Sequence, residues 1–456
     1  MAHQKHDSYG TSDPSTRSSD TYDKPEDRQA ALDAEKQPKE ATPAPPESAG
    51  SSSDFPEGGL QAWLTVLGGW MITFVTAGCM QSFGVYQNYY TLVSLTDHPP
   101  SDISWIGSLQ GGLMFGLPII SGQLFDKGYF RHLIGYGSLL QVFSSFMLSL
   151  VQPHHYYQNF LAQGVGSGIA FGMMFMPALS IPSHYFRKRR ALAMGIVLSG
   201  GSVGSTIYPI LLNKLFNDPS VGFAWGVRAQ SFIELGFLAF ANLVMRTRLP
   251  PRAKKNIDML GIVTDWGYVL TGLGSFLIFW GLFVPYFYLQ LFAAKHNMPA
   301  NIVTYGITVL NALGILGRML PNFFADIFGS FNATIAMSAI CGGLVFALLG
   351  ATKPEGYVPF AVLYGFTSGG FSSLIGPVAA SYSRDVNEVG TRMGLVTFVS
   401  SFALLTGSPI SGALLAAPEY LWWRPVVFSG VTMLSGSVLL LIARMRMAEK
   451  RGTWRV

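Results

Sequence analysis

Long apolar runs, each as long as a membrane crossing requires, dominate this sequence of 456 residues. An α-helix needs roughly 20 mainly apolar residues to cross the hydrocarbon core of a bilayer. Twelve such runs follow residue 54 and leave little chain for a second domain, so the predicted fold class is an all-α membrane protein with twelve transmembrane helices. The runs lie near residues 60–86, 103–125, 132–151, 157–181, 191–212, 223–245, 266–292, 301–324, 331–350, 357–380, 391–415 and 421–443.

The charge and cysteine content supports this class and excludes several others. Only 12% of the residues are charged, whereas a soluble domain carries roughly 25%. The two cysteines, Cys79 and Cys341, lie within apolar runs, which excludes a disulfide framework and a cysteine-based zinc site. The sequence contains no phosphate-binding glycine loop and no pair of histidines at helical metal spacing. We therefore expect no cofactor and no metal.

One motif has the form of a catalytic signature. The segment from Gly200 to Gly204 reads Gly-Gly-Ser-Val-Gly, which fits the pattern of a hydrolase nucleophile elbow. That elbow needs a turn from a strand to a helix, whereas this segment lies inside an apolar helical run. We therefore expect no enzyme. Glycines four residues apart, here and in other spans, are instead expected to let helices pack closely in lipid.

Residues 1–54 differ from the rest of the chain. They hold 17 of its 55 charged residues and few large apolar ones, too few to offset the entropy that folding would cost. We expect a disordered cytoplasmic tail. The polar N-terminus lacks the hydrophobic core of a secretory signal, so no cleavable signal peptide is expected.

The cations predict the orientation of the spans. If both termini are cytoplasmic, 18 of the 30 Lys and Arg residues fall in cytoplasmic segments and 5 in segments on the other side. Cytoplasmic loops of membrane proteins carry such an excess of cations. Both termini are therefore predicted to be cytoplasmic, in the plasma membrane or in a vacuolar or other internal membrane. The basic balance of the chain then reflects its topology, and no nucleic-acid partner is expected.

The body of the chain divides into two similar halves. The longest basic loop, from Arg246 to Lys255, separates the sixth run from the seventh. Matching residues recur 200 positions apart: Asp126 and Asp326, Pro177 and Pro377, and Pro209 and Pro409. We infer two six-helix pseudo-repeats with a binding site between them near the midplane. The predicted domains are a six-helix bundle at 55–246, a cytoplasmic linker at 247–264, a second bundle at 265–444 and a cytoplasmic tail at 445–456.

Arg318 is the most informative single residue, because it lies well inside the eighth run. A cation at that depth costs about 3 kcal/mol on insertion scales, so it should face protein or water. It either binds an anionic group of a solute or forms a structural ion pair. Asn311 shares its helical face, and Gln81 and Tyr286 lie on polar faces of the first and seventh spans. Glu234, within the sixth span, either carries a proton or pairs with a neighbouring helix.

Charged groups at the predicted cytoplasmic ends of the spans are candidates for a gate. The loop that contains Asp126, Lys127 and Arg131 is either a charged latch or a solvated turn. Four successive cations directly precede the fifth span: Arg187, Lys188, Arg189 and Arg190. The corresponding segment of the second half contains Asp385 and Glu388. We expect these two acids to meet the four cations when the cytoplasmic side closes.

Several of these stretches resemble a known family. The Asp126 loop resembles the signature between the second and third spans of the major facilitator superfamily. Two further stretches resemble the paired signatures of its monocarboxylate porter family: Glu57-Gly-Gly-Leu-Gln-Ala-Trp63 and Tyr185-Phe-Arg-Lys-Arg-Arg-Ala-Leu-Ala-Met-Gly195. Gly317-Arg318, together with Ala325-Asp326 and Gly329, is similar to the fungal branch of that family.

The resemblance implies the major facilitator fold, alternating access and secondary active transport that is commonly proton-linked. It assigns the family's eighth-span arginine to Arg318 and adds Asp326, the counterpart of Asp126, to the gate residues. The aspartate that partners this arginine in the family would fall at Gly314. The first-span lysine of proton-coupled monocarboxylate transport would fall at Gln81. Both departures suit a carrier of larger organic molecules.

We therefore expect a secondary active transporter of a small organic solute, either monocarboxylate-like or a larger organic metabolite. Its other partners are the lipid bilayer and, as the resemblance implies, a proton. An efflux carrier for a fungal secondary metabolite is the alternative within this class. A nutrient sensor or receptor that has kept the transporter fold is the alternative from another class. The sequence leaves the direction of transport and the oligomeric state open.

Overall fold

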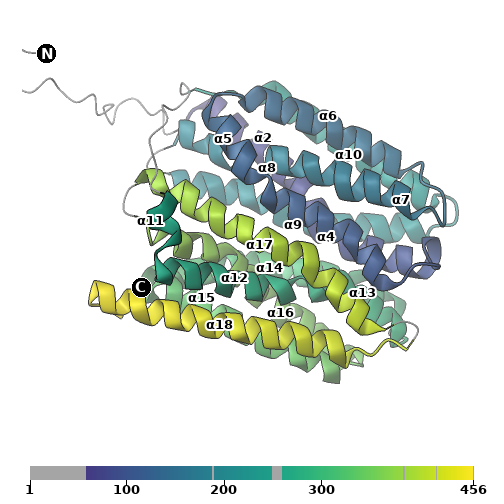
Figure 1. Ribbon diagram of the computed structural model, residues 1–456. Helices are drawn as coiled ribbons and strands as arrows, with labels where there is room; N and C mark the ends of the chain where they lie inside the picture. Colours follow the sequence, from purple (N-terminus) through teal and green to yellow (C-terminus); the bar gives the residue numbers. More distant parts are fainter. Residues whose placement is uncertain (1–57, 187–188, 249–258, 384–385, 417–418, 455–456) are drawn as a thin grey trace, which may run out of the picture. The chain divides into compact units, whose positions relative to one another are not determined.

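The computed structural model describes residues 58–456, apart from 187–188, 249–258, 384–385, 417–418 and 455–456. The predicted tail at 1–54, the cations Arg187 and Lys188 and the acid Asp385 thus lie outside the described residues. Over the described ranges the chain is helical and contains no strand (Figure 1).

The first half of the chain runs from α2 to α10. Its elements are α2 (Leu60–Gln81), α3 (Phe83–Tyr89), the π-helix η1 (Tyr90–Ser94), α4 (Pro100–Gly116), α5 (Pro118–Asp126), α6 (Phe130–Leu148), α7 (Tyr156–Asn159), the π-helix η2 (Phe160–Ser167), α8 (Gly168–Ser180), the 3₁₀-helix η3 (Ile181–His184), α9 (Arg190–Asn217) and α10 (Gly222–Val244).

The second half runs from α11 to α18. Its elements are α11 (Met259–Val263), α12 (Trp266–Leu282), α13 (Val284–Lys295), α14 (Ala300–Phe328), α15 (Ser330–Ala347), the 3₁₀-helix η4 (Leu348–Gly350), α16 (Pro354–Ala380), α17 (Val386–Leu415) and α18 (Trp423–Arg451). The short helix α11 lies within the segment expected as a linker, and α18 continues past the boundary that we placed at residue 444.

Eleven helical stretches of the described chain are long and apolar enough to cross a membrane. They coincide with eleven of the twelve predicted runs. The remaining run is α6, which has the length of a span but carries a row of polar side chains. These polar side chains are buried, and α6 packs against α8 and α10. The predicted all-α membrane fold is confirmed.

Glycines bring pairs of helices into direct contact. A Cβ atom at Gly78 would lie 2.8 Å from Cα of Gly204, and one at Gly369 would lie 3.0 Å from Cα of Gly314. No larger residue fits these positions without a shift of the backbone. Helix α2 therefore packs closely on α9, and α14 packs closely on α16. The expected role of small residues in close helix packing is confirmed at these positions.

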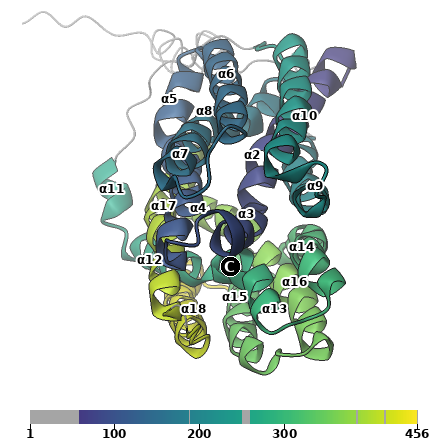
Figure 2. The ribbon, with the colours of Figure 1, turned by 90° about the vertical axis from the view of Figure 1, so that its right-hand side faces the viewer.

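Four pairs of described helices make the main contacts between the two halves: α4 with α17, α9 with α14, α3 with α13, and α5 with α17 (Figure 2). Phe83 of α3 and Phe287 of α13 stack with ring centroids 4.9 Å apart. Near the same end, Gln290 Nε2 donates a hydrogen bond to Asn213 Oδ1 at 2.7 Å, and Asn213 Nδ2 donates one to the carbonyl of Thr304 at 3.1 Å. We call this end the predicted outer end, because the topology places it away from the cytoplasm.

The opposite, predicted cytoplasmic end is packed less tightly between the halves. A Cβ atom at Gly195 of α9, or at Gly390 or Gly394 of α17, would meet nothing within 4 Å. Every hydrogen bond between a described residue of one half and a described residue of the other lies at mid-helix or at the predicted outer end. The structure thus shows a conformation closed at the predicted outer end.

Candidate functional site

Arg318 lies on α14 where this helix faces the first half, and its guanidinium bridges the two halves. Nη2 donates a hydrogen bond to Oε1 of Gln81 on α2 at 2.6 Å, and Nη1 donates one to Oγ of Ser202 on α9. Both acceptors are neutral. None of the ion pairs between described residues includes Arg318. The described part of the chain therefore supplies hydrogen bonds to this cation but no carboxylate.

Two helix interruptions carry predicted site residues. Helix α2 ends at Gln81, and Ser82 separates it from α3. Helix α12 ends at Leu282, and Phe283 separates it from α13. The first turn of α13 contains Pro285, and Tyr286 follows this proline directly. Secondary transporters commonly build their binding sites from helices that are interrupted near the midplane, because backbone and side-chain groups become available there.

Tyr286 and Asn311 add polar groups to the surroundings of Arg318. The Tyr286 hydroxyl lies 3.0 Å from Oγ of Ser368 on α16. Asn311, two turns from Arg318 on α14, is 2% exposed, and neither atom of its amide has a hydrogen-bond partner. An unpartnered buried amide costs about 1–3 kcal/mol. A solute that offers it a donor and an acceptor would recover part of this cost.

Gly314 occupies the position where the resemblance places an aspartate. A Cβ atom there would lie 3.5 Å from the carbonyl oxygen of Gly365 on α16. Gly314 thus lies where α14 meets α16, and no carboxylate stands one turn before Arg318 on α14. Gln81 stands where the resemblance places a lysine, and there it accepts the hydrogen bond from Arg318.

Comparisons with known proteins identify the family of the chain. The sequence profile of the Major Facilitator Superfamily matches residues 59–362. The chain belongs to the major facilitator superfamily. This facilitator is therefore a multi-pass membrane transporter.

Several fungal transporters are similar to this facilitator along most of their length. The aspyridones efflux protein apdF of Emericella nidulans is 39% identical over 401 residues, which are 88% of this chain and 81% of that protein. The agnestins efflux protein AgnL12 of Paecilomyces divaricatus is 40% identical over 388 residues, 85% of this chain and 88% of that protein. These matches cover both halves.

Solved structures show the same fold at low sequence identity. The crystal structure of the nucleoside transporter NupG is 14% identical with a TM-score of 0.64, and it covers 84% of this chain and 98% of that chain. A mutant of the peptide transporter POT in complex with sulfate is 14% identical with a TM-score of 0.67, and it covers 87% of this chain and 98% of that chain.

Glu234 lies apart from the Arg318 site, in the interior of the first half. It is 0% exposed on α10. Its Oε2 accepts a hydrogen bond from Gln141 Nε2 on α6 at 2.9 Å, and its Oε1 accepts one from Gln230 Nε2 at 2.7 Å. The structure therefore does not bring this acid together with Arg318, although the sequence makes both residues candidates for substrate binding or coupling.

The predicted gate residues of the first half lie at the surface. Asp126 ends α5, Lys127 follows it and Arg131 lies in the first turn of α6, all with exposed side chains. Arg189 is exposed as well. Helices α9 and α14 contain the backbones of Arg190 and Asp326, but these two side chains lie outside the described residues.

Glu388 of the second half forms an ion pair within its own helix. Its Oε2 lies 3.2 Å from the guanidinium of Arg392, which is 2% exposed and covers the ring of Tyr268 at 5.2 Å from the ring centroid. Arg392 is one of the 18 cations that the predicted topology assigns to cytoplasmic segments, and the structure corrects its placement in a loop, because its side chain is buried on α17. The expected meeting of Asp385 and Glu388 with the cationic cluster stays a prediction, because Arg187, Lys188 and Asp385 lie outside the described residues.

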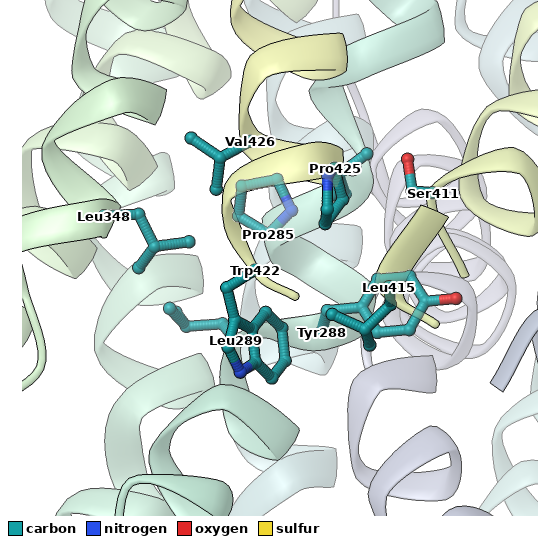
Figure 3. A pocket seen from close by; sticks show the side chains of 10 residues that line it. Pro285, Tyr288, Leu289, Leu348, Ser411, Leu415, Trp422, Pro425 and Val426 are labelled. Atoms are coloured by element: carbon teal, nitrogen blue, oxygen red, sulfur yellow. The ribbon is translucent and has the colours of Figure 1, made fainter. Parts of the chain in front are cut away.

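A small pocket lies at the predicted outer end of the second half, away from Arg318. It is enclosed by α13, the end of α17 and the start of α18 (Figure 3). Its lining is largely apolar and includes Pro285, Leu289 and Trp422, and the hydroxyl-bearing residues are Tyr288 and Ser411. Since it contains no charged side chain, it does not suit an anionic solute.

Sequence reasoning missed two groups of polar residues. Ser202, the serine of the Gly200–Gly204 segment, was considered only as a nucleophile. In the structure its hydroxyl accepts a hydrogen bond from Arg318. Gln230 and Gln141, which hold Glu234, were not singled out. A helical periodicity analysis would have found Gln230, because it lies one turn before Glu234 on the same face of α10.

Proposed function

We propose that this facilitator exports an organic metabolite that carries an anionic group, by alternating access around Arg318. The observation that supports this most is the guanidinium of Arg318 at the junction of the halves, with only neutral acceptors among the described residues. Guanidinium binds carboxylates and similar planar anions with two parallel hydrogen bonds. A bound anion would replace the neutral acceptors of Gln81 and Ser202 by charged oxygen atoms, so that both partners of each hydrogen bond carry charge.

The direction and the kind of metabolite rest on the relatives. Proteins that are 36–40% identical to this chain carry the names aspyridones, agnestins and fujikurins efflux proteins. Export of a fungal secondary metabolite is therefore favoured over uptake of a small monocarboxylate. Placement in the fungal branch of the monocarboxylate porter family rests on the segment from Tyr185 to Gly195. A plasma-membrane location with both termini in the cytoplasm rests on the distribution of cations.

The two helix interruptions fit this mechanism. Gln81 and Tyr286 lie next to Ser82 and Phe283, where α2 and α12 give way to α3 and α13. Helices α3 and α13 close the predicted outer end against each other. A solute at Arg318 lies directly beneath this closure, so a movement of α3 and α13 relative to α2 and α12 would open its way out.

The test compares metabolites inside and outside cells of the host fungus that lack the chain or express it. Wild type should lower the cellular level and raise the external level of at least one organic acid. Arg318→Ala should reduce this export roughly 10- to 100-fold, because the loss of charged hydrogen bonds costs about 1.5–3 kcal/mol. The matched control is Arg424→Ala, which removes an exposed arginine at the predicted outer end. Export by Arg318→Ala at the wild-type rate, with equal amounts at the membrane, would overturn the proposal.

A further inference from the structure

The interior of the first half holds a second ionisable group that the transport of a solute at Arg318 does not use. Glu234 is the one carboxylate in the described membrane spans that does not lie in the first or last turn of a helix. It is fully buried, and none of the ion pairs between described residues includes it. A carboxylate in such a place is expensive when ionised and unpaired.

The partners of Glu234 fit both protonation states. In the structure both carboxylate oxygens accept hydrogen bonds from amide nitrogens, those of Gln141 and Gln230, as an ionised acid requires. The Oε1 atom of Gln141 is buried and has no partner. A half turn of this terminal amide would place that oxygen where the nitrogen now lies. The oxygen could then accept a hydrogen bond from a protonated Glu234, and no other bond would break.

The titratable groups that face Glu234 carry no positive charge. They are the thiol of Cys79 on α2, the phenol of Tyr86 on α3 and the phenol of Tyr208 on α9. From α6 it is faced by Gln141 and by the hydroxyl of Ser145. The negative charge of an ionised Glu234 is thus balanced only by the dipoles of neighbouring amide and hydroxyl groups. A proton neutralises this charge and is small enough for the fully buried site.

Gln230 links Glu234 to the helices of the transport site. Its Nε2, which also donates to Glu234, lies 3.4 Å from Sγ of Cys79, and its Oε1 accepts a hydrogen bond from the Tyr86 hydroxyl at 2.7 Å. Cys79 and Gln81 are two residues apart on α2, so they point roughly 200° apart around that helix. One side of α2 therefore contacts the Glu234 group while the other contacts Arg318.

Tyr86 extends the link to the closed end. It lies on α3, beyond the interruption at Ser82, on the same short helix as Phe83, which packs on Phe287 of the second half. Hydrogen bonds to an ionised acceptor are about twice as strong as neutral ones. An ionised Glu234 therefore fixes Gln230, and through it Tyr86, more firmly than a protonated Glu234 does.

We propose that Glu234 is a proton-binding site whose occupancy is coupled through α2 and α3 to the opening of the predicted outer end. This rests on the proposed export function and deepens it. A hydronium ion from outside gives its proton to a carboxylate oxygen of Glu234 and leaves as water. The proton is returned to water on the cytoplasmic side, so that proton entry is exchanged for solute exit.

The first experiment uses the proton itself as the probe. Infrared difference spectra of the purified full-length chain, recorded between alkaline and acidic pH, should show the carbonyl stretch of a carboxyl group that becomes protonated. Glu234→Gln should lose one such band, because the amide keeps the shape and hydrogen bonds of the site without titrating. Glu355→Gln, which removes an exposed acid in the first turn of α16, should keep that band. A Glu234→Gln spectrum identical to wild type would overturn the site.

The second experiment measures the coupling. Spin labels are attached to cysteines introduced at Val93 and Trp423, two exposed positions at the predicted outer ends of the two halves. The native Cys79 and Cys341 are buried, so the labels go to the introduced sites. The distance between the labels should change with pH in the otherwise wild-type chain and in Glu355→Gln. With Glu234→Gln this shift should be lost.

Either a distance that does not respond to pH, or a shift that survives in Glu234→Gln, would overturn the coupling. Neither experiment needs a solute. Their failure would therefore leave the Arg318 result untouched, and a failure of the export test would leave the proton site standing.

Discussion

The Arg318 site and the Glu234 site solve the same problem in opposite ways. Both place an ionisable side chain in the membrane interior. Arg318 takes its neutral partners from the other half of the molecule, whereas Glu234 takes its partners from α6 and α10 of its own half. A group held across the junction must lose its partners when the halves separate, while a group held within one half keeps them. The arrangement at Arg318 therefore suits the binding and release of a solute. The arrangement at Glu234 suits a proton that stays bound while the two halves move.

The largest expected effect follows from giving Arg318 the carboxylate that it lacks. In Gln81→Glu, the residue that now accepts its hydrogen bond would form an ion pair with the guanidinium and compete with an anionic solute. We expect export to fall about as far as in Arg318→Ala, roughly 10- to 100-fold. The measurement is the export rate at equal membrane levels. Gln81→Asn, which keeps a neutral amide, is the control, and export by Gln81→Glu at the rate of this control would contradict the role of the uncompensated charge.

A smaller effect is expected at the second site. Glu234→Gln keeps the shape of the site but cannot exchange a proton, so its export rate should no longer rise when the external medium is acidified. At alkaline pH, where a proton gradient contributes little, the variant and the wild type should export at similar rates. Export is measured at two external pH values. A variant that responds to pH as the wild type does would separate Glu234 from the coupling.

The link between Glu234 and the closed end can be weakened on its own. Tyr86→Phe removes the hydroxyl that donates to Gln230 and keeps the ring that packs against Phe216. One buried hydrogen bond contributes about 0.5–1.5 kcal/mol. We expect the pH-dependent distance between the predicted outer ends to shift by a correspondingly small amount, with the titration of Glu234 still present. A variant that titrates and moves as the wild type does would show that α3 is not the link.

The smallest effect should come from a residue that belongs to neither site. Asp265 caps α12, and its Oδ1 accepts hydrogen bonds from the backbone amides of Gly267 at 3.1 Å and Tyr268 at 3.4 Å. Asp265→Ala should lower stability by about 1 kcal/mol, seen as a lower unfolding temperature of the purified protein. Its export rate and its pH response, per folded molecule, should equal those of wild type. A change in either would show that effects on stability and on transport are not separable here.

The sequence alone predicted most of the fold, because the length of an apolar span is a local property. The Arg318–Gln81 contact was also within reach, since both residues are polar groups in apolar spans. The interruption after Gln81 was not, because Ser82 lies in a segment without proline, and the path of the chain there depends on the packing of α3 against α13. The side of α10 that Glu234 faces was equally hidden, because it depends on the position of α6. Which end is closed is a property of one conformation, and a sequence that must support both conformations does not show it.

The most direct test of the account is a comparison of one exported acid with its neutral methyl ester. Both are offered to inside-out vesicles that contain either wild type or Arg318→Ala, and the uptake rates are compared. If Arg318 recognises the anionic group, wild type should prefer the acid roughly 10- to 100-fold, and Arg318→Ala should transport both compounds at the same low rate. If the variant discriminates between the two as strongly as the wild type does, Arg318 does not recognise the charge of the solute, and the account is wrong at its centre.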